Sequence, residues 1–233
     1  MSQTTSSIPI IYEDNHLLVV EKPVNMPTQE DASKDPDLLS ILKEDIKVRY
    51  QKPGNVYLGL VHRLDRPVGG VMVFAKTSKA ASRLSEQIRT RTFGKGYLAV
   101  VHNTPSPVEG RLEHYLAKNR ATNTVQIVKP STKEGKQAIL EYKVLETKDM
   151  LSLAYVELLT GRSHQIRVQF SAVGHPLYGD QKYGTHVNKP GQQIALWSHE
   201  VRFLHPTIKE GMVFYSQPPA QHPWSLFTTH DSY

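Results

Sequence analysis

The first third of the chain alternates short apolar runs with polar turns. Residues 8–20 are rich in β-branched and apolar side chains, and the polar residues 13–15 interrupt them. This pattern predicts a strand pair that ends at residues 22–23, because a proline cannot continue a central strand. A second apolar run at residues 71–75 predicts another strand, and residues 56–61 lead toward it.

Three segments repeat apolar residues at the spacing of a helix. The first covers residues 38–48 and follows a proline that favours helix initiation. The second follows Thr77-Ser78, which can cap a helix, and the third begins at Ser163 and stops before Gly174. In the second segment, the face opposite the apolar positions carries cationic side chains: Lys79, Arg83, Arg89 and Arg91.

The later apolar segments have the character of strands. Residues 97–102 predict one strand, and residues 137–145 and 151–159 predict an antiparallel hairpin that turns near residue 148. Hairpins interrupted by a few helices predict an α+β fold with a mixed, largely antiparallel central sheet and flanking helices and loops. We expect residues 1–9 to form an N-terminal tail and residues 10–233 to form one domain, since 233 residues leave little room for a second.

Composition narrows the class of protein. A formal net charge of +6 favours binding to a polyanion, and its distribution adds to that. Residues 76–120 contain 9 Lys and Arg against 3 Asp and Glu, whereas residues 1–75 contain 8 against 10. The chain has no cysteine, which excludes disulfides and thiolate metal sites and favours the cytoplasm. Neither a signal peptide nor an apolar run of about 20 residues is present, so we expect no membrane association.

Candidate chemistry is concentrated in one charged turn. His62-Arg63-Leu64-Asp65 is followed by Arg66 and by the glycines of residues 69–70. Flanking arginines favour the ionised form of Asp65, and an ionised carboxylate suits attack on, or stabilisation of, a sugar anomeric carbon beside phosphates. We expect the two glycines to permit a tight turn.

Two further segments accompany this turn, at residues 10–23 and 159–168. Taken in order, the three motifs resemble the RluA family of pseudouridine synthases, which isomerise uridine to pseudouridine in folded RNA. The resemblance runs from about residue 10 to residue 224. It implies a reaction without any cofactor or metal, on tRNA or rRNA, by a cytoplasmic monomer. The S4-type RNA-binding module of many relatives is not expected here, because the first motif begins so early.

The resemblance, together with polar residues beside the motifs, gives eight candidate site residues. Asp65 matches the essential aspartate, Tyr97 the active-site tyrosine, and Arg167 the basic residue paired with that aspartate. Whether Asp65 acts as nucleophile or through a glycal route stays open. Arg63 matches the arginine that fills the gap left by the extruded nucleotide, as base extrusion requires. The remaining substrate-binding candidates are His62, Lys22, Arg162 and His164.

The chain departs from the family's usual residues in three places. Val68 and Gly69 replace a common threonine-serine pair after the aspartate, Gly96 replaces a common threonine, and Gln169 replaces a common histidine. These changes suggest a divergent branch with a different RNA target.

Two other functions compete with this interpretation. His62 and Asp65 could contribute to a metal site for phosphodiester hydrolysis, but no second carboxylate cluster accompanies them and nearby arginines oppose a divalent cation. A non-catalytic RNA-binding or ribosome-assembly factor with the same fold needs only the basic surface. It predicts that Asp65→Asn leaves function intact.

Overall fold

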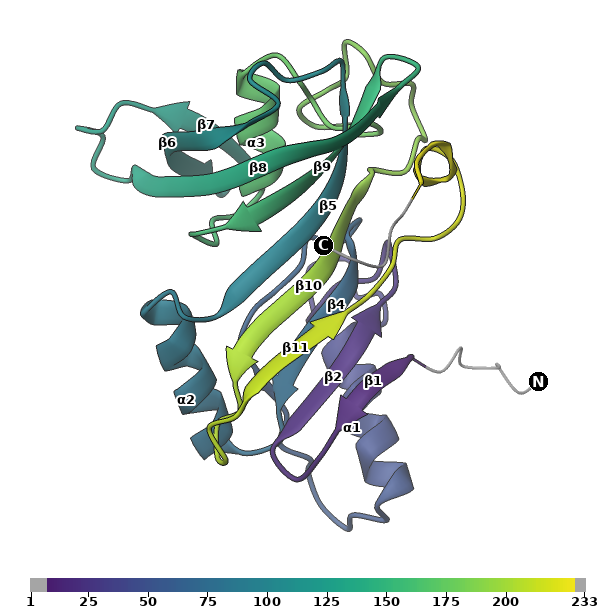
Figure 1. Cartoon of the computed structure of the whole chain (residues 1–233). Helices are drawn as coiled ribbons and strands as arrows, with labels where there is room; N and C mark the ends of the chain where they lie inside the picture. The colour runs from purple at the N-terminus through teal and green to yellow at the C-terminus, as the bar shows by residue number, and fades with distance from the viewer. Residues whose placement is uncertain (1–7, 229–233) are drawn as a thin grey trace. The chain divides into compact units, whose positions relative to one another are not determined.

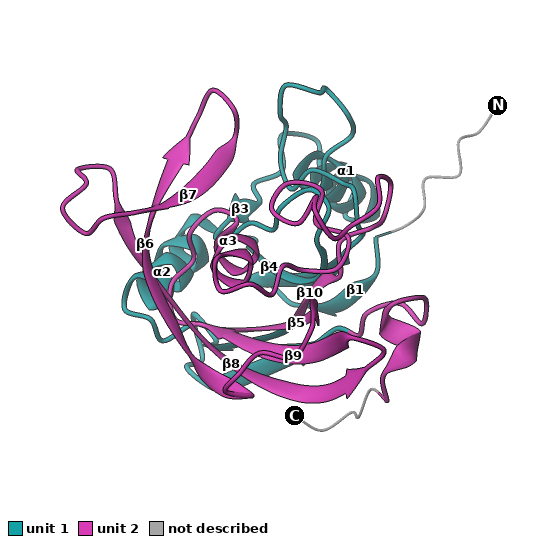
Figure 2. Cartoon of the chain, turned by 90° about the horizontal axis from the view of Figure 1, so that it is seen from above, with its two compact units in different colours: residues 1–93, 200–216 teal, residues 94–199, 217–233 magenta. Residues whose placement is uncertain are grey.

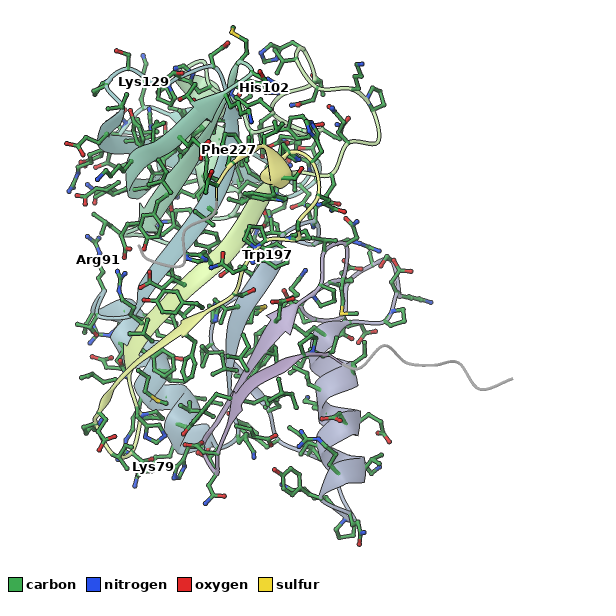
Figure 3. The ribbon with its side chains drawn as sticks, turned by 45° about the vertical axis from the view of Figure 1, so that its right-hand side comes forward. Lys79, Arg91, His102, Lys129, Trp197 and Phe227 are labelled. Atoms are coloured by element: carbon green, nitrogen blue, oxygen red, sulfur yellow. The ribbon has the colours of Figure 1, made fainter. Side chains whose placement is uncertain are left out.

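The computed structural model describes residues 8–228, so most of the predicted tail at residues 1–9 lies outside it. The chain divides into two compact units, which Figure 2 colours separately. Unit 1 comprises Met1–Phe93 and Glu200–Ser216, and unit 2 comprises Gly94–His199 and Gln217–Tyr233. One catalytic domain with two lobes would also divide in this way, so a single domain over residues 10–233 stays a prediction.

Unit 1 is built on antiparallel strands. Its strands are β1 (Ile10–Glu13), β2 (Leu17–Lys22), β3 (Gly59–Leu60), β4 (Gly69–Ala75), β11 (Gly211–Tyr215) and the second half of β10 (Leu196–Leu204). Strand β2 lies between β1 and β4, β3 pairs with β4, and β11 pairs with β10. Every residue of β4 is buried, which explains its uninterrupted apolar sequence.

Two helices belong to unit 1, and side chains cap both. In α1 (Leu38–Arg49) the Asp37 carboxylate accepts a hydrogen bond from the Ser40 amide at 3.1 Å. In α2 (Ser78–Arg89) the Thr77 hydroxyl accepts one from the Ala80 amide at 3.2 Å. Helix α2 buries its apolar face in the core of unit 1, which contains Leu17, Val19, Val71, Val73, Ala75, Ala80, Leu84, Phe93, Val201 and Phe203.

Unit 2 contains five antiparallel strands in the order β5-β9-β8-β6-β7. Their bounds are Gly94–His102 for β5, Glu109–Asn119 for β6, Thr124–Val128 for β7, Lys136–Lys148 for β8 and Leu151–Leu158 for β9. Helix α3 (Gln165–Ala172) packs against β6 and β7 through Leu116, Val125, Ala138 and Val168, on the concave side of the curved sheet in Figure 2. A short 3-10 helix, Trp224–Leu226, follows near the C-terminus.

The predicted α+β class is confirmed, as are all three helices. Strands β6, β7 and β10 were not predicted. The prediction of a tight turn at residues 69–70 is wrong, because Gly69 begins β4. The turn lies one step earlier, where the Val68 amide donates to the Asp65 carbonyl at 2.9 Å. Gly70 has a φ of +113°, a conformation that only glycine adopts at low cost. Within residues 8–228, no helix is both long enough and apolar enough to span a membrane.

Candidate active site

The Asp65 loop connects β3 to β4 and is fixed by its buried neighbours. Leu64 and Val68 are 6% and 2% exposed, and they hold the half-buried Asp65 between them. The Thr28 hydroxyl donates to the Leu64 carbonyl at 3.0 Å, which ties the loop to the segment before α1. Burial of Val68 also explains why this position is apolar here. Asp65 is therefore presented on a backbone held from both sides.

The side chain of Lys22 holds the same loop through hydrogen bonds to backbone carbonyls. Its side chain is completely buried, and its Nζ donates to the carbonyls of Pro23, Arg66 and Val68 at 2.9, 3.1 and 2.7 Å. Burial lowers the pKa of Lys22 to about 7, while the charge of Asp65 raises that pKa and the charge of Arg66 lowers it. Because all three donors are occupied, the predicted role of Lys22 in substrate binding can only be exerted through the loop it holds.

Replacing Lys22 by methionine is expected to reduce the free energy of unfolding by about 1–3 kcal/mol, because three buried carbonyls lose their donor. Between pH 7 and the unfolded-state pKa of 10.5, the unfolded lysine binds a proton that the folded one lacks. Stability of the wild type relative to Lys22→Met should therefore rise with pH over that window. Denaturant titrations at several pH values measure this. Lys47→Met, which changes an exposed lysine of α1, is the control, and a pH-independent difference contradicts the assignment.

The two arginines beside Asp65 differ in their contacts. Arg63 is exposed, and in the described part of the chain its guanidinium has no hydrogen bond or ion pair. Arg66 instead binds the segment before α1, where it donates to the Asn25 carbonyl, the Ser33 hydroxyl and the Asp35 carboxylate. Arg66 therefore tethers that segment to the Asp65 loop. Arg63 keeps its donors available for a ligand.

His62 has one ring nitrogen fixed by the fold. Its Nε2 accepts a hydrogen bond from the Val73 amide at 3.0 Å, and its ring lies 5.6 Å from the ring of Phe93. An accepting Nε2 carries no proton, so the neutral tautomer has its proton on Nδ1. His62 therefore anchors the start of the motif to strand β4.

In unit 2, Tyr97 lies on β5 opposite Val156 of β9 and is 6% exposed. The preceding position requires glycine. A Cβ on Gly96 would lie 2.3 Å from the hydroxyl oxygen of Tyr155, which fills the space that a threonine would need. The departure at Gly96 and the tyrosine at position 155 are therefore coupled by packing.

Arg167 of α3 forms a buried ion pair with a residue that the sequence did not single out. Its Nε and Nη2 donate to the two carboxylate oxygens of Asp180 at 2.8 and 2.7 Å. Asp180 also accepts from the amides of Lys182 and Tyr183, and these donors hold the pKa of its carboxyl below the ordinary value against the opposing effect of burial. Asp180 thus fixes one edge of the Arg167 guanidinium, whose Cζ lies 5.3 Å from the Tyr183 ring centre.

The turn before α3 holds the two remaining candidates. Arg162 is exposed, and its Nε donates to the Gln137 carbonyl at 2.9 Å. His164 has a φ of 52°, in the left-handed region, and its Nδ1 lies 2.7 Å from the hydroxyl of Tyr183. Tyr183 therefore contacts both His164 and Arg167. No sequence motif indicated this residue, because the contacts arise only in the folded chain. Gln169, the third departure, is buried and its amide donates to β6 and β8, so it serves packing in this chain.

Comparison with known proteins defines the class. A family model described as RNA pseudouridylate synthase matches residues 16–172. The human RNA pseudouridylate synthase domain containing 4 structure has the same fold, with a TM-score of 0.76 and 22% identity over 91% of this chain and 88% of that one. The human domain containing 1 structure gives 0.74 and 25% over 95% and 87%. The protein is thus an RNA-modifying isomerase by class.

Relatives that are similar in sequence define the family within this class. The uncharacterized RNA pseudouridine synthase YhcT of Bacillus subtilis is 33% identical over 94% of this chain and 73% of its own length. The ribosomal large subunit pseudouridine synthase D of Zymomonas mobilis is 32% identical over 91% of this chain and 69% of its own length. The chain belongs to the RNA pseudouridylate synthase family, of the RluA type. It spans roughly two thirds to three quarters of these relatives.

Proposed function

We propose that this chain isomerises a specific uridine in structured tRNA or rRNA, with the Asp65 carboxylate as the essential catalytic group. One observation carries the proposal: the family motif places Asp65 on a loop held by the buried Lys22 ammonium and by Thr28. Breaking the N1–C1′ bond and forming a C5–C1′ bond needs no external energy source. A carboxylate held in place suits such a reaction, because preorganisation reduces the cost of orienting it.

The other roles follow from the family motifs and from the local geometry of each unit. Arg63 is the exposed guanidinium that takes the place of the extruded nucleotide, and a planar cation suits stacking and phosphate contact. Tyr97 stacks on the freed uracil. Arg167, whose orientation Asp180 fixes, is the basic partner of the catalytic acid. His62, Arg162 and His164 complete the substrate-binding set, and we propose that the enzyme works as a cytoplasmic monomer without cofactor or metal.

Mapping pseudouridines in RNA from cells with and without this protein tests the proposal. We expect the loss of pseudouridine at one or a few positions in tRNA or rRNA, and its return when the gene is restored. Purified protein should release tritium from RNA that contains 5-tritiated uridine. An unchanged map together with no tritium release from total tRNA or rRNA would refute it in favour of a non-catalytic RNA-binding factor.

A further inference from the structure

Lys95 is a half-buried cation that the proposed reaction does not use. It lies near the start of β5, a strand labelled in Figure 1, two residues before Tyr97. Its Nζ reaches the turn between β9 and α3 at Gly161. A Cβ built on Gly161 of that turn would lie 2.9 Å from the Lys95 Nζ. Any larger residue at position 161 would therefore displace the ammonium.

Within the described residues, the ammonium of Lys95 has no hydrogen-bond acceptor. Over residues 8–228 it donates no hydrogen bond and makes no ion pair. Burial lowers the pKa of Lys95, the charge of Glu157 opposes that shift, and the charge of Arg162 adds to it. The Arg162 guanidinium is thus close enough for its charge to act on Lys95.

Arg162 is positioned beside Lys95 with donors to spare. Its Nε is held by the Gln137 carbonyl, and its main-chain amide donates to the side chain of Gln165 at 3.0 Å. Its two Nη groups make no hydrogen bond within the part of the chain that the structure describes. The guanidinium is therefore anchored by one donor and presents the others outward.

Lys95 has no acceptor within residues 8–228 and Arg162 is held only through its Nε, so these neighbouring positive charges cost stability unless a ligand supplies negative charge. A phosphodiester group fits this pair well, because its two anionic oxygens can accept from an ammonium and a guanidinium together. Glu157, the acidic group that acts on Lys95, also accepts from the hydroxyl of Tyr155 at 3.2 Å. Glu157 therefore acts on Lys95, and the Arg162 guanidinium adds a second positive charge beside it.

We propose that Lys95 and Arg162 together bind one phosphodiester group of the RNA substrate. Position 161 is a glycine because the Lys95 side chain occupies the space that a Cβ would need. This inference rests on the proposed function, since it takes RNA as the ligand. It assigns a binding role to Lys95 and explains why a glycine precedes Arg162. The pair is a binding site and takes no part in bond making.

The test compares Lys95→Met, Lys95→Arg and the control Lys143→Met, which alters an exposed lysine of β8. The dissociation constant for an unmodified tRNA transcript is measured across a range of salt concentrations. Lys95→Met should reduce the slope of log affinity against log salt by about one, whereas Lys95→Arg and Lys143→Met should keep the wild-type slope. Lys95→Met should also melt no lower than the wild type, because it removes a cation without an internal acceptor.

A second measurement covers the case in which Lys95→Met fails to fold. Lysines of the wild-type protein are labelled by ¹³C-methylation, and the Lys95 signal is followed as inorganic phosphate is added. A saturable shift supports the site. An unchanged salt slope in folded Lys95→Met, or no shift with phosphate, overturns it. If Lys95→Met reduces the salt dependence of RNA binding as expected but the wild type forms no pseudouridine, the phosphate site is supported and the proposed function is refuted.

Discussion

Replacement of Asp65 by asparagine is expected to abolish pseudouridine formation while RNA binding persists. The change keeps the size of the side chain and removes its charge, so a catalytic carboxylate is lost without a change in shape. We expect tritium release from 5-tritiated uridine to fall by at least about three orders of magnitude, as when an essential nucleophile is removed. Affinity for RNA should stay within a few fold, because the exposed cations are unchanged.

The matched control is Asp45→Asn on α1, which alters an aspartate paired with Arg49 and remote in sequence from the motif. It should retain wild-type tritium release. Asp65→Asn should fold normally, since Leu64, Val68 and the Lys22 bonds continue to hold the loop. Wild-type turnover in Asp65→Asn would remove the basis for the proposed mechanism and favour a non-catalytic RNA-binding protein.

Local patterns predicted much of unit 1. The turn after β1, the helix start after Pro36, the cap at Thr77 and the apolar face of α2 are all recorded within a few neighbouring residues. Helix α3 was predicted for the same reason. Such features depend on periodicity and capping, which act over short stretches of chain.

Strand β10 shows what local patterns could not predict. Its sequence contains Ser198, His199 and Glu200, and all three are buried. Buried polar residues are stable only when distant parts of the chain supply hydrogen bonds, which no local pattern records. Strand β6 escaped prediction for a different reason: its alternating charged residues lie on an exposed face and give a weak apolar signal.

The candidate site divides in the same way. Asp65 stands in a recognisable motif, but the burial of Lys22 depends on carbonyls 44 and 46 residues away. Asp180 follows Gly179 in a loop with no helical or strand pattern, and its pairing with Arg167 exists only in the folded chain. Gly179 marks a constrained backbone there, because its φ is +74° and a Cβ at this position would lie 2.1 Å from the Gln193 carbonyl oxygen.

The second large effect concerns stability. Asp180→Ala should lower the free energy of unfolding by about 3–5 kcal/mol, because it removes a buried carboxylate that binds two donors of the buried Arg167 guanidinium. Asp180 is 0% exposed and Arg167 is 7% exposed, so water cannot replace the lost partner. The amides of Lys182 and Tyr183 lose their acceptor in the same change.

Glu141→Ala provides the contrast, because Glu141 is 53% exposed and meets Arg111 at 3.5 Å. An exposed pair of that kind contributes at most about 0.5 kcal/mol, so this variant should unfold like the wild type. Adding Arg167→Met to Asp180→Ala should recover part of the loss, since the buried positive charge that Asp180 balanced is removed as well. Because the pKa of the Asp180 carboxyl is lowered in the fold, its contribution should be present above about pH 4 and decline as acid protonates it. Denaturant unfolding of the three variants at pH 7 and pH 3 decides the matter: equal stability of Asp180→Ala and Glu141→Ala at pH 7 would show that the pair does not hold α3.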